Sequence, residues 1–90
     1  MEIKVNKRSD DEHLVVITSD DGSSTEHIVN VSDEVHQKLT GGICSKELLI
    51  EKSIEFLLER EPKEAILQGF EIMKIAEYFP EYPDEIKKVI

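Results

Sequence analysis

The side chains in this sequence that could do chemistry are three histidines and one cysteine. His13 and His27 fall in apolar stretches, and His36 and Cys44 follow further along the chain. Imidazole nitrogens and thiolates are common zinc ligands, and a thiol near a helix N-terminus is the setting of many reactive cysteines. A metal site or a catalytic cysteine therefore depends on which of these residues the fold brings together.

Three β-strands are predicted in the first third of the chain, near residues 2–7, 12–19 and 25–31. Between the last two, Asp21-Gly22 is typical of a two-residue hairpin turn, because glycine takes positive φ freely and aspartate tolerates it. Such a turn pairs Val16 with His27 and Leu14 with Val29. His13 and His27 then lie on opposite faces of the hairpin, so they cannot share a metal ion.

The cysteine has no partner group close by in the sequence. No second cysteine forms a CxxC motif with Cys44, and the Gly41-Gly42 loop separates it from His36. A lone cysteine beside an apolar residue is more often a small buried side chain than a nucleophile. The carboxylates stand at positions that face water, and no phosphate-binding loop is present. We therefore expect no enzyme activity, no catalytic residue, no metal ligand and no cofactor.

The remaining two thirds of the chain predict helices near residues 33–40, 46–60, 63–68, 71–79 and 83–89. Ser32 and Ser45 precede the first two and are good N-caps. The 46–60 helix carries apolar residues around most of its circumference. A helix of this kind is buried on two sides, so it is central either to the fold or to a dimer.

The predicted fold class is α+β, in one small domain over residues 1–90. An N-terminal three-stranded antiparallel meander (1–31) is followed by a helical part (32–90), with four to five helices packed on the meander. The predicted core consists of Leu14, Val16, Val29, Leu39, Leu49, Ile50, Ile54, Leu57, Ile66, Phe70, Ile75 and Phe79.

Aromatic residues suggest where a partner would bind. Residues 78–83 hold three of the five aromatic residues and two of the three prolines. Such a stiffened loop either closes the core or presents a docking surface, and we take Tyr78 and Tyr82 as candidate partner contacts. If the 46–60 helix forms a homodimer, Phe56 is the candidate contact, because it lies beside a stripe of glutamates.

The charge balance excludes several classes of partner. The chain has 11 basic and 20 acidic residues, a formal charge of −9 and no basic cluster. This argues against binding nucleic acid or an anionic membrane surface. The apolar runs fall far short of the ~20 residues of a membrane span, and the N-terminus lacks the apolar core of a signal peptide. We therefore expect a cytoplasmic protein.

The string LIEKSIEFLLEREPKEAIL (49–67), together with Phe70 and YFPEY (78–82), resembles a family of short, uncharacterised prokaryotic proteins. In that family the corresponding half reads approximately LIEKSFEFLLEREP and ends in YFPEYE. The resemblance covers roughly residues 48–86 and departs at Ile54 and Pro83. Because the family has no established function, the resemblance implies a genuine domain and assigns no functional residue.

A weaker resemblance runs over residues 27–58, where a strand, a helix, a glycine-containing turn and a second helix are similar to a ribbon-helix-helix DNA-binding unit. It implies that Glu26 and Asn30 would face the bases. The first helix and its turn are short for that fold, and the strand has no lysine or arginine. The sequence thus favours a non-enzymatic, acidic protein-interaction domain whose partner is another protein or a second copy of itself. The alternative is a dimeric ribbon-helix-helix-like DNA-binding regulator or antitoxin.

Overall fold

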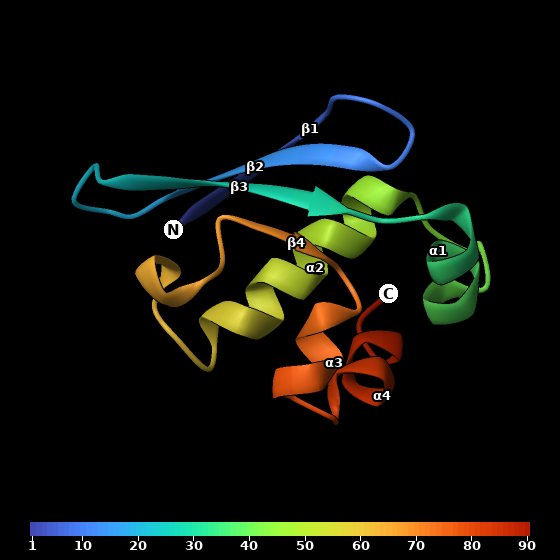
Figure 1. The fold of residues 1–90 in the computed structure, drawn as a ribbon. Helices are drawn as coiled ribbons and strands as arrows, with labels where there is room; N and C mark the ends of the chain where they lie inside the picture. The colour runs from blue at the N-terminus through green and yellow to red at the C-terminus, as the bar shows by residue number, and fades with distance from the viewer.

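The three predicted strands form, and a fourth joins them in one sheet. β1 (Glu2–Lys7), β2 (Glu12–Thr18) and β3 (Ser24–Asn30) pair antiparallel in chain order, and β4 (Gly69–Glu71) adds to β3 in parallel. In the computed structural model, which describes residues 1–90, the helices lie on one face of this sheet (Figure 1). The α+β class is confirmed. The three-stranded antiparallel meander is wrong, because the sheet has four strands and is mixed.

The hairpin between β2 and β3 reverses at the predicted place through a longer loop. Thr18 pairs with Ser24, which leaves five residues, 19–23, in the loop. Within it, Asp21 Oδ1 accepts hydrogen bonds from the backbone N–H and the hydroxyl of Ser23, at 3.0 and 2.7 Å, and Gly22 has a φ of 88°. Aspartate commonly stabilises a turn by bonding to the backbone two residues on. The register is therefore one residue away from the predicted one.

This shift of one residue exchanges the two faces of β2 relative to β3, so that Val15 and Ile17, and not Leu14 and Val16, share a face with His27 and Val29. Five residues turn toward the helices and are buried: His13, Val15, Ile17, His27 and Val29. Leu14 and Val16, which we expected in the core, lie partly exposed on the outer face of the sheet. His13 and His27 lie on the same face of the sheet, so their predicted placement on opposite faces is wrong.

The first two helices begin at the predicted caps. Ser32 accepts a hydrogen bond from the N–H of Val35 and starts α1 (Asp33–Thr40), which ends at Gly41 with a φ of 65°. Ser45 accepts from the N–H of Leu48 and starts α2 (Lys46–Leu58). The bounds of α1 agree with the prediction, and α2 ends two residues early.

The chain after Pro62 contains less helix than predicted. Residues 63–68 form only a short 3₁₀ turn, η1 (Lys63–Ala65), and β4 replaces the start of the predicted 71–79 helix. What remains of that helix is α3 (Lys74–Tyr78), and α4 (Tyr82–Lys87) corresponds to the predicted 83–89 helix. Buried Phe70 and Ile72 flank exposed Glu71, which is the two-residue period of a strand.

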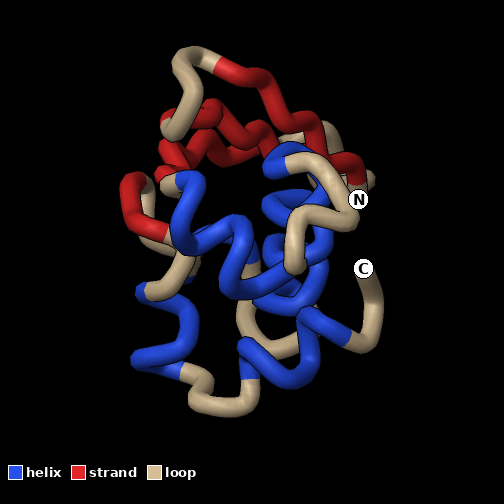
Figure 2. The backbone as a smooth tube through the Cα atoms, turned by 90° about the vertical axis from the view of Figure 1, so that its right-hand side faces the viewer, coloured by secondary structure: helices blue, strands red, loops and turns tan.

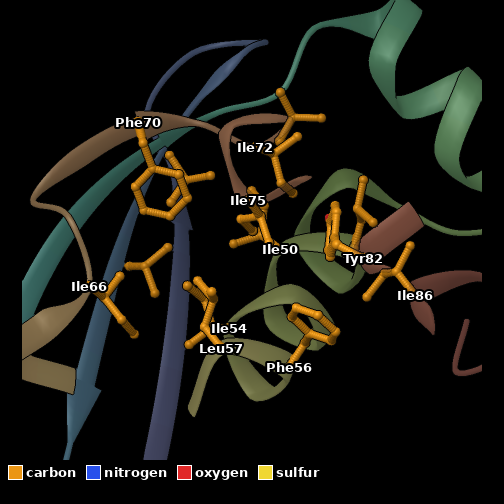
Figure 3. Packing of buried hydrophobic residues seen from close by; sticks show 14 of the residues in the cluster. Ile50, Ile54, Phe56, Leu57, Ile66, Phe70, Ile72, Ile75, Tyr82 and Ile86 are labelled. Atoms are coloured by element: carbon orange, nitrogen blue, oxygen red, sulfur yellow. The ribbon is translucent and has the colours of Figure 1, made fainter. Parts of the chain in front are cut away.

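The core lies between the sheet and the helices. Sixteen buried apolar residues form one cluster between the sheet and the helices, which Figure 2 shows as two layers. α2 runs through this cluster, with β1 on one side and α4 on the other (Figure 1). Figure 3 shows Ile54 and Leu57 of α2 between the Ile66–Phe70 segment and the C-terminal helices. Nine of the twelve predicted core residues are buried; Leu14, Val16 and Phe79 are only partly buried.

Candidate functional site

The structure separates the three candidate partner contacts. Tyr78 is 62% exposed at the end of α3, whereas Phe56 and Tyr82 are 6% and 0% exposed. A residue that contacts a partner must be exposed, whereas Phe56 and Tyr82 are buried in the core. The expectation that these two residues contact a partner is therefore wrong. Among the three, only Tyr78 remains a candidate contact.

The interior contacts of Phe56 and Tyr82 explain their burial. The Phe56 ring packs edge-on against Phe79 and Tyr82, with ring centroids 5.9 and 5.3 Å apart, and the Arg60 guanidinium lies 3.6 Å from its centroid. The Tyr82 hydroxyl shares a 2.6 Å hydrogen bond with Ser53 Oγ, and Ser53 donates to the Leu49 carbonyl. Burial raises the pKa of Tyr82 well above its usual range. These contacts fill the part of the core between α2 and α4.

An apolar groove opens beside Tyr78. Its volume is about 330 Å³, and eight of its ten lining residues are hydrophobic. We name it the Tyr78 groove; its lining residues are Leu57, Glu61, Ala65, Ile66, Leu67, Phe70, Lys74, Ile75, Tyr78 and Phe79. Leu57, Ile66, Phe70 and Ile75 are buried and belong to the core cluster, so the groove reaches down to the core. Its volume is at the low end of the roughly 300–1,000 Å³ that small-molecule sites occupy.

The sides of the groove are exposed apolar side chains. Leu67 is 43% and Tyr78 62% exposed, and both are among the five large apolar residues that the fold leaves open to water. They come from different elements, the connection before β4 and the end of α3. Sequence reasoning missed Leu67 because it placed this residue in a helix. The period-two pattern at Phe70 and Ile72 was the signal for an extended segment here.

Only two charged residues line the groove. Lys74 pairs with Glu77 at 3.3 Å, whereas the half-buried Glu61 forms no ion pair. The basic residues on either side of Glu61 have other partners: Arg60 pairs with Glu59 and Glu81, and Lys63 with Glu64. The groove thus combines an apolar floor with one unneutralised carboxylate.

The histidines do not form a second site. His27 is buried with both ring nitrogens bonded, Nδ1 to the Leu67 carbonyl at 2.7 Å and Nε2 to the Thr25 hydroxyl at 2.8 Å. The Nδ1 bond ties the segment before β4 to β3, and the Nε2 bond lies within β3. His13 is fully buried without a hydrogen-bond partner, and the nearest carboxylate, that of Glu47, lies 3.7 Å from its Nε2. Nowhere do three histidine, cysteine or acidic side chains come close enough to hold a metal ion.

Cys44 lies between α1 and α2, and His36 is bonded to its backbone carbonyl rather than to its thiol. Burial raises the pKa of the Cys44 thiol. This shift is opposite to the one that makes a cysteine nucleophilic at neutral pH. The contact between His36 and Cys44 therefore positions a loop and does not activate the sulfur.

A larger hollow, of about 740 Å³, lies between the first half of β3 and η1, but only three of its eleven lining residues are hydrophobic. Lys63, which is only 5% exposed, lies in this hollow and is held by Ser23 and Glu64. Its charged group is already neutralised within the chain. Because ligand sites are mostly apolar with a few free polar groups, the Tyr78 groove is the better candidate.

Fold and site together define a small α+β protein with an open apolar groove beside a sheet edge. In comparisons with protein-family models, curated proteins and solved structures, nothing matches this chain. The resemblance to the uncharacterised prokaryotic family therefore stays a prediction. β3 pairs with β2 and β4 of its own chain, whereas a ribbon-helix-helix dimer pairs this strand with its copy. No helix has the length and apolar character needed to cross a membrane.

Proposed function

We propose that this chain is a non-enzymatic protein-interaction module, and that the Tyr78 groove receives a large apolar side chain from a partner protein. The observation that carries this proposal is the groove itself, with its core-lined floor and the exposed Leu67 and Tyr78 at its sides. Tyrosine is enriched among the residues that dominate binding at interfaces, and water-excluding apolar contacts around an anchor strengthen it.

The expected affinity is modest. Burying one leucine or phenylalanine side chain contributes about 1.5–3 kcal/mol. Association also loses translational and rotational freedom, so a single anchor gives weak binding without further contacts. The surface charge selects against acidic partners, because the chain carries −9 and the carboxylate of Glu61 in the groove is unpaired. The favoured partner is a segment in which an apolar residue stands among basic ones.

Selection from a displayed random-peptide library tests this function. We expect enriched peptides to carry a leucine or aromatic residue beside lysine or arginine. A variant with both Leu67→Ser and Tyr78→Ser should bind them at least about tenfold more weakly, because it removes the apolar sides of the groove. Ile43→Ser is the matched control, since Ile43 is 74% exposed and lies outside the groove.

Two results would contradict the proposal. One is a selection that enriches no peptide. The other is a set of peptides that binds the double variant as tightly as the wild type. Circular dichroism of the three proteins shows whether each variant keeps its fold.

A further inference from the structure

The outer edge of β4 offers backbone groups that have no partner. Toward β3, the Ile28 N–H donates to the Gln68 carbonyl at 2.7 Å and the Ile72 N–H to the Asn30 carbonyl at 2.9 Å. In a strand, the backbone groups of successive residues point to opposite edges. Gly69 and Glu71 therefore direct their N–H and C=O groups away from β3, and none of these four groups makes a hydrogen bond.

This edge is open in the fold. β4 is the last strand of the sheet and lies at its margin in Figure 2, with no segment drawn beyond it. A side chain built at Gly69 would meet no atom closer than the Ile28 carbonyl oxygen, at 3.9 Å. The opposite edge of the sheet is β1, where exposed Lys4 and Lys7 supply the charges that commonly protect an edge from pairing.

The open edge and the Tyr78 groove lie next to each other. Phe70 stands between Gly69 and Glu71 in β4, and its side chain forms part of the groove floor. In a sheet, residues that face each other on paired strands project to the same side. A residue opposite Phe70 on an added strand would thus direct its side chain to the side on which the groove opens.

Charge decides which segment fits this position. Glu61 lines the groove and Glu71 lies on β4, whereas Lys74, the one basic residue of the lining, is already paired with Glu77. Lysine or arginine on the added strand would complement this excess of carboxylates. A second copy of this chain carries the same net charge of −9, which opposes self-association.

We infer that the partner segment binds as an extended strand along β4. Its backbone bonds to Gly69 and Glu71, its large apolar side chain opposite Phe70 enters the Tyr78 groove, and its basic residues lie near the carboxylates. This inference rests on the proposed function and adds the conformation and chemistry of the partner. Strand addition of this kind combines main-chain hydrogen bonds, which give affinity, with a side-chain pocket, which gives specificity.

Amide hydrogen exchange with a defined peptide tests the inference. The probe is a nine-residue peptide with a central phenylalanine among alternating threonines and lysines, and its matched control has glutamates in place of lysines. With the probe at saturation, we expect the amides of Gly69 and Glu71 to exchange at least about tenfold more slowly. The Phe70 amide faces β3, so its exchange should change much less. The acidic peptide should bind at least about tenfold more weakly.

Backbone methylation of the probe gives a second readout. N-methylating every second amide of the probe gives two peptides. In one of them the methylated amides are those whose N–H groups face β4, and in the other they are those whose N–H groups face water. We expect the first pattern to weaken binding at least about tenfold and the second much less. On the protein, Glu71→Pro removes an outward N–H that the sheet does not use, whereas Glu71→Gln keeps it. Both variants lose the carboxylate of Glu71. Glu71→Pro should therefore weaken binding more than Glu71→Gln, because it alone also removes the N–H.

The outcomes separate the inference from the proposed function. If the probe binds, loses affinity in the Leu67→Ser/Tyr78→Ser variant, and leaves the exchange of Gly69 and Glu71 unchanged, strand addition is wrong and the groove function stands. Equal effects of the two methylation patterns overturn strand addition as well. If neither the probe nor any library peptide binds, the proposed function fails and the inference falls with it.

Discussion

At the scale of single residues, His13 has the least favourable environment in the fold. Its ring is fully buried, and neither nitrogen has a hydrogen-bond partner. An unsatisfied buried polar group carries a desolvation penalty of about 1–3 kcal/mol, which an apolar side chain of similar size avoids. His27 lies on the same face of the sheet, opposite Val15 in the neighbouring strand, and both of its ring nitrogens are bonded.

These two histidines form a matched pair for stability measurements. We expect His13→Leu to raise the free energy of unfolding by up to about 1–3 kcal/mol, and His27→Leu to lower it by a similar amount because it leaves its partners unbonded. Urea denaturation at pH 7 measures both. A loss of stability in His13→Leu as large as that in His27→Leu would show that the His13 ring is hydrogen-bonded in solution.

Phe56 supports a second prediction at this scale. Because its ring packs against Phe79, Tyr82 and the Arg60 guanidinium, Phe56→Ala should lower the free energy of unfolding by about 3–5 kcal/mol. Phe56→Glu should unfold the chain, since it places a charge in the core. Thermal melts followed by circular dichroism check both variants. A folded, monomeric Phe56→Glu protein would instead place Phe56 at an interface.

The sequence predicted which residues are buried only where it also predicted the secondary structure and its register. Ile50, Ile54 and Leu57 were expected in the core and are buried, because a helix that is apolar around most of its circumference must lie inside the fold. For the hairpin, Asp21-Gly22 indicated the place of reversal. The loop is stabilised by the two hydrogen bonds that Ser23 donates to Asp21. One residue more or less in this loop shifts the register and so changes which β2 residues share a face with the buried residues of β3.

At the scale of secondary-structure elements, Lys46 ties three segments together. Its ammonium group contacts Asp33 of α1 at 2.6 Å and, before β2, the Asp11 carboxylate at 3.1 Å and the Asp10 carbonyl at 2.9 Å. Hydrogen bonding to Lys46 lowers the pKa of Asp33 below its usual 3.8. A carboxyl group with a lowered pKa stabilises the fold when ionised, and this contribution disappears as the pH falls through its folded-state pKa.

The pH dependence of stability tests this tie. Between about pH 5 and pH 2 the wild type should lose stability more steeply than Lys46→Met, which removes the largest cause of the lowered pKa of Asp33. Lys88→Met is the control, because Lys88 pairs only with Glu85 at an exposed position. Urea midpoints measured across this range give the slopes. Equal slopes for wild type and Lys46→Met would mean that the ion pair does not persist in solution.

The elements that the sequence did not predict are those that depend on distant partners. β1, β2, β3, α1 and α2 follow from local periodicity and caps, and they form close to their predicted bounds. β4 has three residues and pairs with β3, about 40 positions earlier in the chain. So short a strand owes its conformation to that pairing and to the His27–Leu67 bond, not to local propensity. The alternation at Phe70 and Ile72 indicates an extended segment but not the strand with which it pairs, so the Tyr78 groove, which depends on that pairing, could not be predicted.

At the scale of the whole molecule, the fold covers α2 with β1 on one side and α4 on the other. A homodimer through this helix needs one of its two apolar sides to be open, and both are occupied within one chain. We therefore expect light scattering to give the mass of a single chain, 10.3 kDa, at a concentration of about 100 μM. A mass about twice as large would indicate a dimer, which would have to use another face.

The net charge also acts on the whole molecule. With −9 at neutral pH, the chain attracts basic segments over the range set by the ionic strength. The affinity for the lysine-containing probe should therefore fall as the salt concentration rises. The ratio of the affinities of the probe with a central phenylalanine and the probe with a central alanine should stay constant. This separates the electrostatic part of binding from the groove.

The most direct test of the groove as an anchor site is a cycle of four affinities. Fluorescence anisotropy measures the probe with a central phenylalanine, and the same peptide with a central alanine, on wild type and on Ala65→Phe, in which a larger side chain on the groove wall fills the space. On the wild type, we expect phenylalanine to bind at least about tenfold more tightly than alanine, and on Ala65→Phe we expect the two peptides to bind alike. Equal affinities on the wild type, or a preference for phenylalanine that persists in Ala65→Phe, would contradict the account.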